Sequence, residues 1–240
     1  MDTKAAVEEL SRSLEALASP ERALQEKRYL KSDLEHLGVT VPAITRTTGH
    51  WWARIDGRRD DALRLVEALW APGIHELRMA AVKLLESSAD LLEPQDIDLI
   101  ENLIRRSRTW AYVDELAAAV SGPLLERHPA ADEILDRWAR DENFWVRRSA
   151  LLAHLVALRG GGGDWDRFTR YADAMLGEKE FFIRKAIGWV LRDTARKRPD
   201  MVYAWILPRT PRASGVTVRE AVKRLSPAQA EAVMTAYRSS

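Results

Sequence analysis

The 240-residue sequence contains no cysteine, which excludes a disulfide framework, a thiol nucleophile and a cysteine-ligated zinc or iron–sulfur site. It has only five histidines and no HExxH pattern, so we expect no metal site. It has no run of about 18 apolar residues, the length that a membrane-spanning helix needs. The charged, amphipathic N-terminus also lacks the apolar core of a signal peptide. These absences predict a soluble, cytoplasmic protein.

The charge is distributed unevenly along the chain. Residues 1–180 carry 25 Lys/Arg and 32 Asp/Glu, a net charge of −7, whereas residues 181–240 carry 12 Lys/Arg and 4 Asp/Glu, a net charge of +8. A basic block beside an acidic body favours a polyanionic partner. A solvated basic face explains the same composition equally well.

Apolar residues recur at spacings of three and four through almost the whole chain, which is typical of amphipathic helices. No alternating pattern long enough for a strand is present. Short breaks separate the helical stretches, at Ser19-Pro20, Pro72-Gly73, Gly122-Pro123, residues 160–163 and residues 208–211. The pattern predicts an all-α fold, and we expect one domain over residues 1–240.

A similar five-residue segment recurs along the chain. Each copy starts with an aliphatic residue and continues into small or apolar residues; the starts are Leu77, Val113, Val146, Ile183 and Val218. The intervals are 36, 33, 37 and 35 residues. A period in the middle thirties with two helices per unit is typical of a helical solenoid, here a HEAT-like α-α superhelix with a concave groove.

One copy of the segment differs from the others in its second residue. Arg78, Arg147, Arg184 and Arg219 occupy that position elsewhere, but Asp114 occupies it in the middle copy, and Trp110 lies four residues earlier. On a helix, side chains at this spacing share one face. An aromatic face attracts a cation, and a carboxylate stabilises nearby positive charge or orients a water molecule. The alternative is that the tryptophan packs in the core and the acid caps a helix or forms a salt bridge.

Four stretches of the sequence resemble the AlkD-type DNA alkylation-repair glycosylases. They are TWAYVDELAAAVSGPLL (109–125), DENFWVRRSALLAHL (141–155), KEFFIRKAIGWVLRDTARKRPD (179–200) and RYLKSDLEHLGVTVP (28–42). The resemblance implies a HEAT-like solenoid that holds duplex DNA in its groove and releases alkylated bases such as 3-methyladenine and 7-methylguanine without flipping the lesion. Some members of that family accept bulky minor-groove adducts.

The resemblance also implies roles for individual residues. Asp114 matches the catalytic acid, and Trp110 and Trp189 match the two DNA-facing tryptophans. Residues matched to DNA contacts are Arg148, Arg192, Tyr29 and Lys31. We add Lys185 and Arg219 from the basic C-terminal repeats. If Arg147 is a structural arginine, Arg148 is left for a phosphate.

The sequence thus predicts a monomeric glycosylase that needs no cofactor or metal and acts on alkylated duplex DNA in the nucleoid. A non-catalytic repeat protein that binds damaged or branched DNA is the alternative, and a protein-binding HEAT scaffold is a third possibility. The preferred adduct is left open. Scattered along the sequence, the histidines suggest neither a base nor a ligand.

Overall fold

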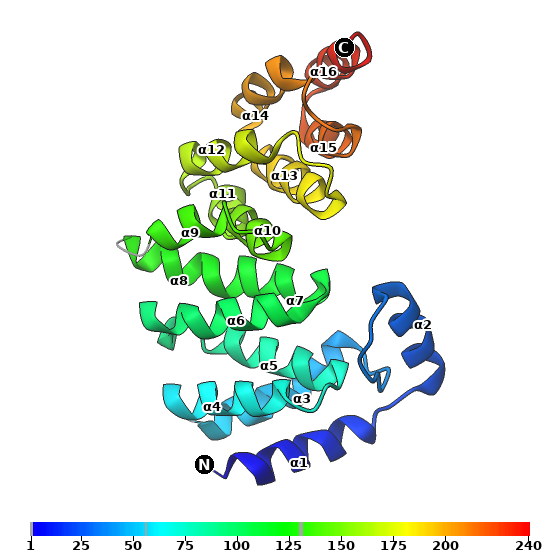
Figure 1. Ribbon diagram of the computed structural model, residues 1–240, viewed down its shortest axis with the longest axis vertical. Coiled ribbons are helices and arrows are strands. Elements are labelled where there is room, and N and C mark those ends of the chain that lie inside the picture. Colours follow the sequence, from blue (N-terminus) through cyan, green and yellow to red (C-terminus); the bar gives the residue numbers. More distant parts are fainter. Residues whose placement is uncertain (1, 56, 130–131) are drawn as a thin grey trace. The chain divides into compact units, whose positions relative to one another are not determined.

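The computed structural model describes residues 2–55, 57–129 and 132–240, and these are arranged as successive helices (Figure 1). Among them, the only strand-like pairing is an isolated bridge between Glu35 and Ile74. The predicted all-α, helical-repeat class is therefore confirmed. No helix in this part of the chain has the length and apolar character required to cross a membrane.

The chain divides into two compact units, Met1–Leu116 and Ala117–Ser240. The single domain expected over residues 1–240 remains a prediction. The α-helices of the N-terminal unit are α1 (Thr3–Glu15), α2 (Pro20–Leu30), α3 (Val41–Ile55), α4 (Arg59–Trp70), α5 (His75–Ser87), α6 (Ile97–Ser107) and α7 (Trp110–Glu115). Those of the C-terminal unit are α8 (Gly122–Arg127), α9 (Asp132–Trp138), α10 (Phe144–Leu152), α11 (Leu155–Gly160), α12 (Trp165–Met175), α13 (Phe181–Thr194), α14 (Pro199–Ile206), α15 (Gly215–Ala221) and α16 (Pro227–Arg238).

The aliphatic residue that starts each repeated segment lies in the core. All five residues are at most 1% exposed, and each is the third or fourth residue of its helix: Leu77 in α5, Val113 in α7, Val146 in α10, Ile183 in α13 and Val218 in α15. Burying an aliphatic side chain stabilises the fold by about 1.5–3 kcal/mol relative to exposure. The repeat seen in the sequence therefore corresponds to a repeat of core positions.

Polar side chains connect successive repeats at the same period. In the C-terminal unit, Arg159 Nε donates to Asp193 Oδ2, 34 residues along the chain, at 2.8 Å. Arg209 forms a two-pronged ion pair with Asp173, 36 residues away. The N-terminal unit has an equivalent link, in which Tyr112 and His75 lie 37 residues apart and contact each other. These contacts confirm the period in the middle thirties within each unit.

Three of the four recurring arginines have a structural role at the starts of their helices. Arg147 Nη1 donates to the carbonyl oxygen of Asp141 at 2.6 Å, and Arg184 Nε donates to that of Glu178, also six residues upstream and at 2.6 Å. Arg78 Nε donates to the carbonyl oxygen of Trp70 at 3.3 Å. Each guanidinium therefore fastens the start of its helix to the chain that precedes it.

The helix break expected at Gly122-Pro123 is wrong. The chain is helical without interruption from Trp110 to Arg127, because a π-helical segment, η3 (Leu116–Ser121), connects α7 to α8. Pro123 has no N–H to donate, and its ring crowds the carbonyl oxygen four residues earlier. The wider π turn accommodates both effects without ending the helix.

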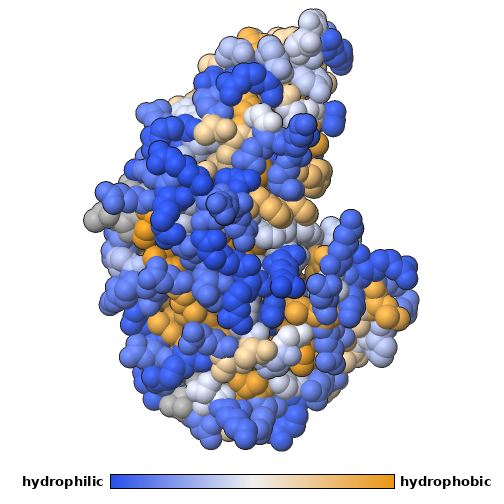
Figure 2. Space-filling view, viewed as in Figure 1, coloured by the Kyte–Doolittle hydropathy of each residue, from blue (hydrophilic) through white to orange (hydrophobic). Residues whose placement is uncertain are grey.

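Most of the face of the molecule seen in Figure 2 is hydrophilic, with smaller hydrophobic patches between the charged side chains. Large apolar side chains that are exposed include Leu24, Tyr29, Val156 and Phe181. Single exposed apolar residues are normal on a protein surface. Tyr29 differs from a single exposed residue because its ring contacts that of Trp110.

Candidate functional site

Helix α7 places Trp110 and Asp114 one turn apart. Thr109 is the N-cap residue, and its hydroxyl accepts a hydrogen bond from the Ala111 amide at 3.4 Å. Trp110 is the first residue of the helix and Asp114 the fifth, and both are half-buried. Thr109, and not Asp114, is therefore the N-cap of α7. The pair occupies one face of the helix, as the sequence predicted.

Tyr29 contacts Trp110 from a distant part of the sequence. The two rings meet edge to face, with 5.9 Å between their centroids and 88° between their planes. Tyr29 lies in the last turn of α2 and is 72% exposed. Together the two rings form an aromatic surface one helical turn from Asp114, and this surface is accessible to a large ligand.

The residue next to Asp114 has a different role. Lys83 Nζ lies 3.0 Å from Glu115 Oε2 and 2.8 Å from Glu86 Oε2. Burial lowers the pKa of Lys83, but the hydrogen bond that Lys83 donates to Glu86 and the charge of Glu115 outweigh that effect and raise the pKa. Glu115 therefore links α7 to α5, whereas Asp114 is the acid on the face of Trp110.

Five cationic side chains surround a pocket of about 380 Å³ in the N-terminal unit; they are Lys31, Arg78, Arg105, Arg106 and Arg108. The pocket extends to Thr109, which directly precedes Trp110. Of these cations, the sequence indicated a DNA contact only for Lys31, and it gave Arg78 as a repeat arginine. The run Arg105-Arg106-Ser107-Arg108 immediately before the candidate helix was the signal for the others. Convergent cations create a positive potential that attracts anions such as phosphate.

In the C-terminal unit, α13 carries three of the predicted residues on one face. Lys185, Trp189 and Arg192 follow one another at helical spacings of four and three. Trp189 is half-buried. Glu220 of α15 accepts hydrogen bonds from both Lys185 Nζ and Arg192 Nη1.

The Glu220 carboxylate is held ionised by its neighbours. Its burial raises the pKa, but hydrogen bonds from Lys185 and Lys223 and the charge of Arg192 outweigh burial and lower the pKa to about 2. Lys185 and Arg192 are thus partly neutralised within the protein. Arg219, the residue before Glu220, is exposed.

Arg148 does not have the exposure that the sequence suggested. It is 2% exposed, its Nη1 donates to the carbonyl oxygen of Phe182, and its guanidinium lies 5.8 Å from the centre of the Phe182 ring. Arg147 is engaged in structural contacts, as expected, but this does not leave Arg148 open to a ligand. A phosphate contact by Arg148 remains a prediction, and it requires the guanidinium to leave this position.

Two of the histidines that are scattered along the sequence meet in the structure. His36 and His75 stack face to face, with 4.4 Å between ring centroids and 9° between ring planes. Burial, together with the charge of His36, lowers the pKa of His75 to about 3. The two residues are far apart in the sequence, and only the packing of the chain between α2 and α3 against the start of α5 brings them together.

Comparisons with known proteins identify the family and the fold of the chain. Residues 10–225 match the family model described as "DNA alkylation repair enzyme". The fold is similar to that of a solved structure titled "Predicted DNA alkylation repair enzyme from Enterococcus faecalis", with a TM-score of 0.78, 22% identity, and coverage of 88% of this chain and 97% of that one. It is also similar to AlkD2 from Streptococcus mutans, with a TM-score of 0.60, 17% identity, and coverage of 87% and 100%. A search of curated proteins gave no significant match.

Proposed function

Because the chain belongs to the DNA alkylation repair enzyme family, we propose that it is a DNA glycosylase that hydrolyses the N-glycosidic bond of cationic N3- and N7-alkylated purines in duplex DNA. The observation that carries the proposal is the placement of Asp114 one turn from Trp110, on the helix that also bears the contact with Tyr29. The proposed substrates are 3-methyladenine, 7-methylguanine and bulkier minor-groove adducts.

The chemistry requires little of the protein beyond a carboxylate. In an alkylated purine the base already carries a positive charge, so when the bond between C1′ and nitrogen breaks, the bonding electrons leave with the base and neutralise it. The sugar is left as an oxocarbenium ion, and water adds at C1′ and releases a proton. Asp114 stabilises the developing charge on the sugar and orients the water, without protonating the base.

The aromatic residues provide the surface on which the damaged nucleotide rests. The Trp110 face attracts the cationic sugar by a cation–π interaction, and the exposed Tyr29 edge extends that surface. Because Tyr29 is largely exposed, these rings support contact with the deoxyribose and backbone from outside the duplex. The lesion then needs no flipping into a pocket. Trp189 on α13 provides a second aromatic contact in the C-terminal unit.

Basic residues in each unit supply contacts to the DNA backbone. In the N-terminal unit these are Lys31 and the arginines around the pocket beside Thr109. In the C-terminal unit they are Lys185, Arg192 and Arg219, and phosphate competes with Glu220 for the first two. Binding by ion contacts of this kind weakens steeply as salt concentration rises. The protein acts as a monomer on intracellular DNA, and the reaction needs no cofactor.

A base-release assay tests the proposal. Three duplexes, carrying 7-methylguanine, 3-methyladenine or a bulky N3-alkyladenine, are each incubated with excess protein, and free base is separated and quantified. Release of at least one base, with an abasic site left in the duplex, is the expected result. Binding of all three duplexes with no release of base would instead favour the non-catalytic DNA-binding alternative.

A further inference from the structure

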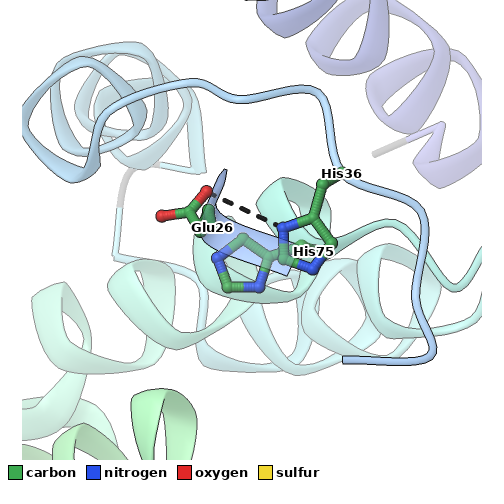
Figure 3. A group of neighbouring side chains, drawn as sticks. All are labelled: Glu26, His36 and His75. Atoms are coloured by element: carbon green, nitrogen blue, oxygen red, sulfur yellow. Dashed lines mark ion pairs between the residues drawn. The ribbon is translucent and has the colours of Figure 1, made fainter. Parts of the chain in front are cut away.

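Three side chains that the proposed reaction does not use come together inside the N-terminal unit. Glu26 of α2, His36 of the following loop and His75 at the start of α5 each offer a ligand atom, and these atoms lie within 4.8 Å of one another (Figure 3). His75 is 2% exposed, and the side chains of His36 and Glu26 are 1% and 15% exposed. Such a cluster is costly to bury unless its polar atoms are satisfied.

Several of these polar atoms are not satisfied by the protein. Glu26 Oε2 and both ring nitrogens of His36 are buried and have no hydrogen-bond partner among the described residues. His36 Nδ1 and Glu26 Oε2 face each other at 3.7 Å, which is too long for a hydrogen bond. Buried polar groups are nearly always hydrogen-bonded, so His36 Nδ1 and Glu26 Oε2, which face each other beyond hydrogen-bond length, point to a missing ligand.

The third residue is oriented in a way that suits a metal ligand. The Tyr112 hydroxyl contacts both His75 Nδ1, at 2.5 Å, and the His75 carbonyl oxygen, at 3.3 Å. A hydroxyl has one proton, and the carbonyl oxygen can only accept. Both contacts are therefore met when Nδ1–H donates to the hydroxyl and the hydroxyl donates to the carbonyl oxygen. This tautomer leaves a lone pair on Nε2, and such a fixed second nitrogen is typical of ligating histidines.

The loop that carries His36 is held firmly on both sides. The His75 amide donates to the Glu35 carbonyl oxygen at 2.8 Å. Glu76 accepts hydrogen bonds from the amides of Leu37, Gly38 and Val39 at 2.7–3.2 Å. Gly38 has a φ of +80°, and a Cβ there would lie 2.2 Å from the Ser19 carbonyl oxygen, so only glycine fits. The backbone around His36 is thus placed before any ligand arrives.

We propose that Glu26, His36 and His75 bind one divalent transition-metal ion of the zinc type, which fastens α2 to the start of α5. Two imidazoles and one carboxylate, with water as a fourth ligand, form a common zinc ligand set. A tetrahedral ion at about 2.1 Å from each ligand places the ligand atoms about 3.4 Å apart. The ligand atoms here must therefore draw together, and the His36 and His75 rings turn out of their stack as the ion binds.

The ion has a route to the site and a structural consequence. A recess lined by Lys27, Asp33, Glu35 and His36, among others, opens beside the cluster. None of the residues of α2, all within the described ranges, is buried. This helix consequently has little apolar anchoring, yet it carries Tyr29. An ion held by Glu26 fixes α2 through a strong bond close to that tyrosine.

Equilibrium dialysis and thermal unfolding of the full chain test this site independently of any action on DNA. The protein is stripped with a chelator, dialysed against Zn²⁺ or Mg²⁺, and its bound metal is quantified. We expect one Zn²⁺ per chain, no bound Mg²⁺, and a rise in Tm of about 5 °C at a hundredfold excess of Zn²⁺ over Kd. Failure of the wild-type chain to bind Zn²⁺ overturns the proposal.

Two variants locate the site, and two control variants at exposed positions check them. His36→Phe keeps a ring against His75 but removes both unpaired nitrogens, and Glu26→Gln removes the charged ligand. Each should weaken Zn²⁺ binding about tenfold or more. The exposed residues His50 and Glu21 supply the controls His50→Gln and Glu21→Gln, which should bind as the wild type does. Without metal, His36→Phe should unfold at the wild-type Tm or above, because it buries no unpaired nitrogen.

Binding that survives in His36→Phe and in Glu26→Gln overturns the assignment of these ligands. If His36→Phe does not fold, Glu26→Gln still tests it, because the Glu26 side chain is the more accessible of the two.

Discussion

The rings of Tyr29 and Trp110 meet edge to face, with 88° between their planes and 5.9 Å between their centroids. This contact joins the last turn of α2 to the first turn of α7. The exposed Tyr29 ring therefore lies against the helix that carries Asp114. An edge-to-face pair contributes about 0.5–1.5 kcal/mol beyond the apolar area it buries.

Removal of the Tyr29 ring should therefore weaken the reaction without unfolding the protein. We expect Tyr29→Ala to lower kcat/KM for release of 7-methylguanine about three- to tenfold, which corresponds to the loss of one contact with DNA worth about 0.6–1.4 kcal/mol. Tyr29→Phe keeps the ring edge and should stay within about twofold of wild type. In urea unfolding, Tyr29→Ala should lose about 0.5–1.5 kcal/mol, the energy of the edge-to-face pair, and Tyr29→Phe should match the wild type within about 0.5 kcal/mol. Equal activity of Tyr29→Ala and wild type would show that the ring does not touch DNA.

The Glu220 carboxylate should make stability depend on acid pH. Its pKa is about 2 in the folded protein and 4.5 in a free side chain. A lowered pKa stabilises the fold fully above pH 4.5, and this contribution is lost as pH falls toward 2. We expect the free energy of unfolding of the wild type to fall more steeply between pH 4.5 and pH 2 than that of Glu220→Gln. Parallel pH profiles for the two proteins would contradict the ion-pair assignment.

The same variant should strengthen DNA binding. Glu220→Gln frees Lys185 and Arg192 from their shared partner, so more positive charge is available to phosphates. We expect tighter binding of undamaged duplex. The slope of log Kd against log salt concentration should also increase by the amount that about one to two additional phosphate contacts produce. If affinity is unchanged, the face of α13 that bears these cations does not meet DNA.

Variants of Arg148 and Arg219 should distinguish an arginine that stabilises the fold from one that contacts a phosphate. Arg148→Met leaves the Phe182 carbonyl oxygen without its buried donor, and we expect a loss of about 1–3 kcal/mol in the free energy of unfolding. Arg219→Met should change stability by less than about 0.5 kcal/mol but reduce the salt dependence of DNA binding by about one contact. A stable Arg148→Met variant that shows the reduced salt dependence would instead make Arg148 a phosphate contact.

The sequence predicted the helices and their repeat well because both depend on local periodicity. Leu77, Val113, Val146, Ile183 and Val218 revealed the repeat, and all five are buried. The sequence also placed Trp110 and Asp114 on one face, since their spacing on a helix is fixed.

Contacts between distant segments were not predictable from spacing. Nothing local indicates that Tyr29 meets Trp110 or that His36 stacks on His75. Arg148 also misled, because two adjacent arginines point in different directions from one helix and only packing decides which is buried. The Gly122-Pro123 pair predicted a helix break, but the helix continues through it by way of a π-helical segment. In each case the deciding interactions lie outside the segment.

The most direct test of the catalytic assignment is the Asp114→Asn variant, measured under single-turnover conditions with protein in excess. Asparagine keeps the size of the side chain and removes only the charge that stabilises the sugar cation. We expect release of 7-methylguanine to slow about 100-fold or more, while the Kd for the same duplex stays within about twofold of wild type. Release at the wild-type rate by Asp114→Asn would contradict the proposed mechanism.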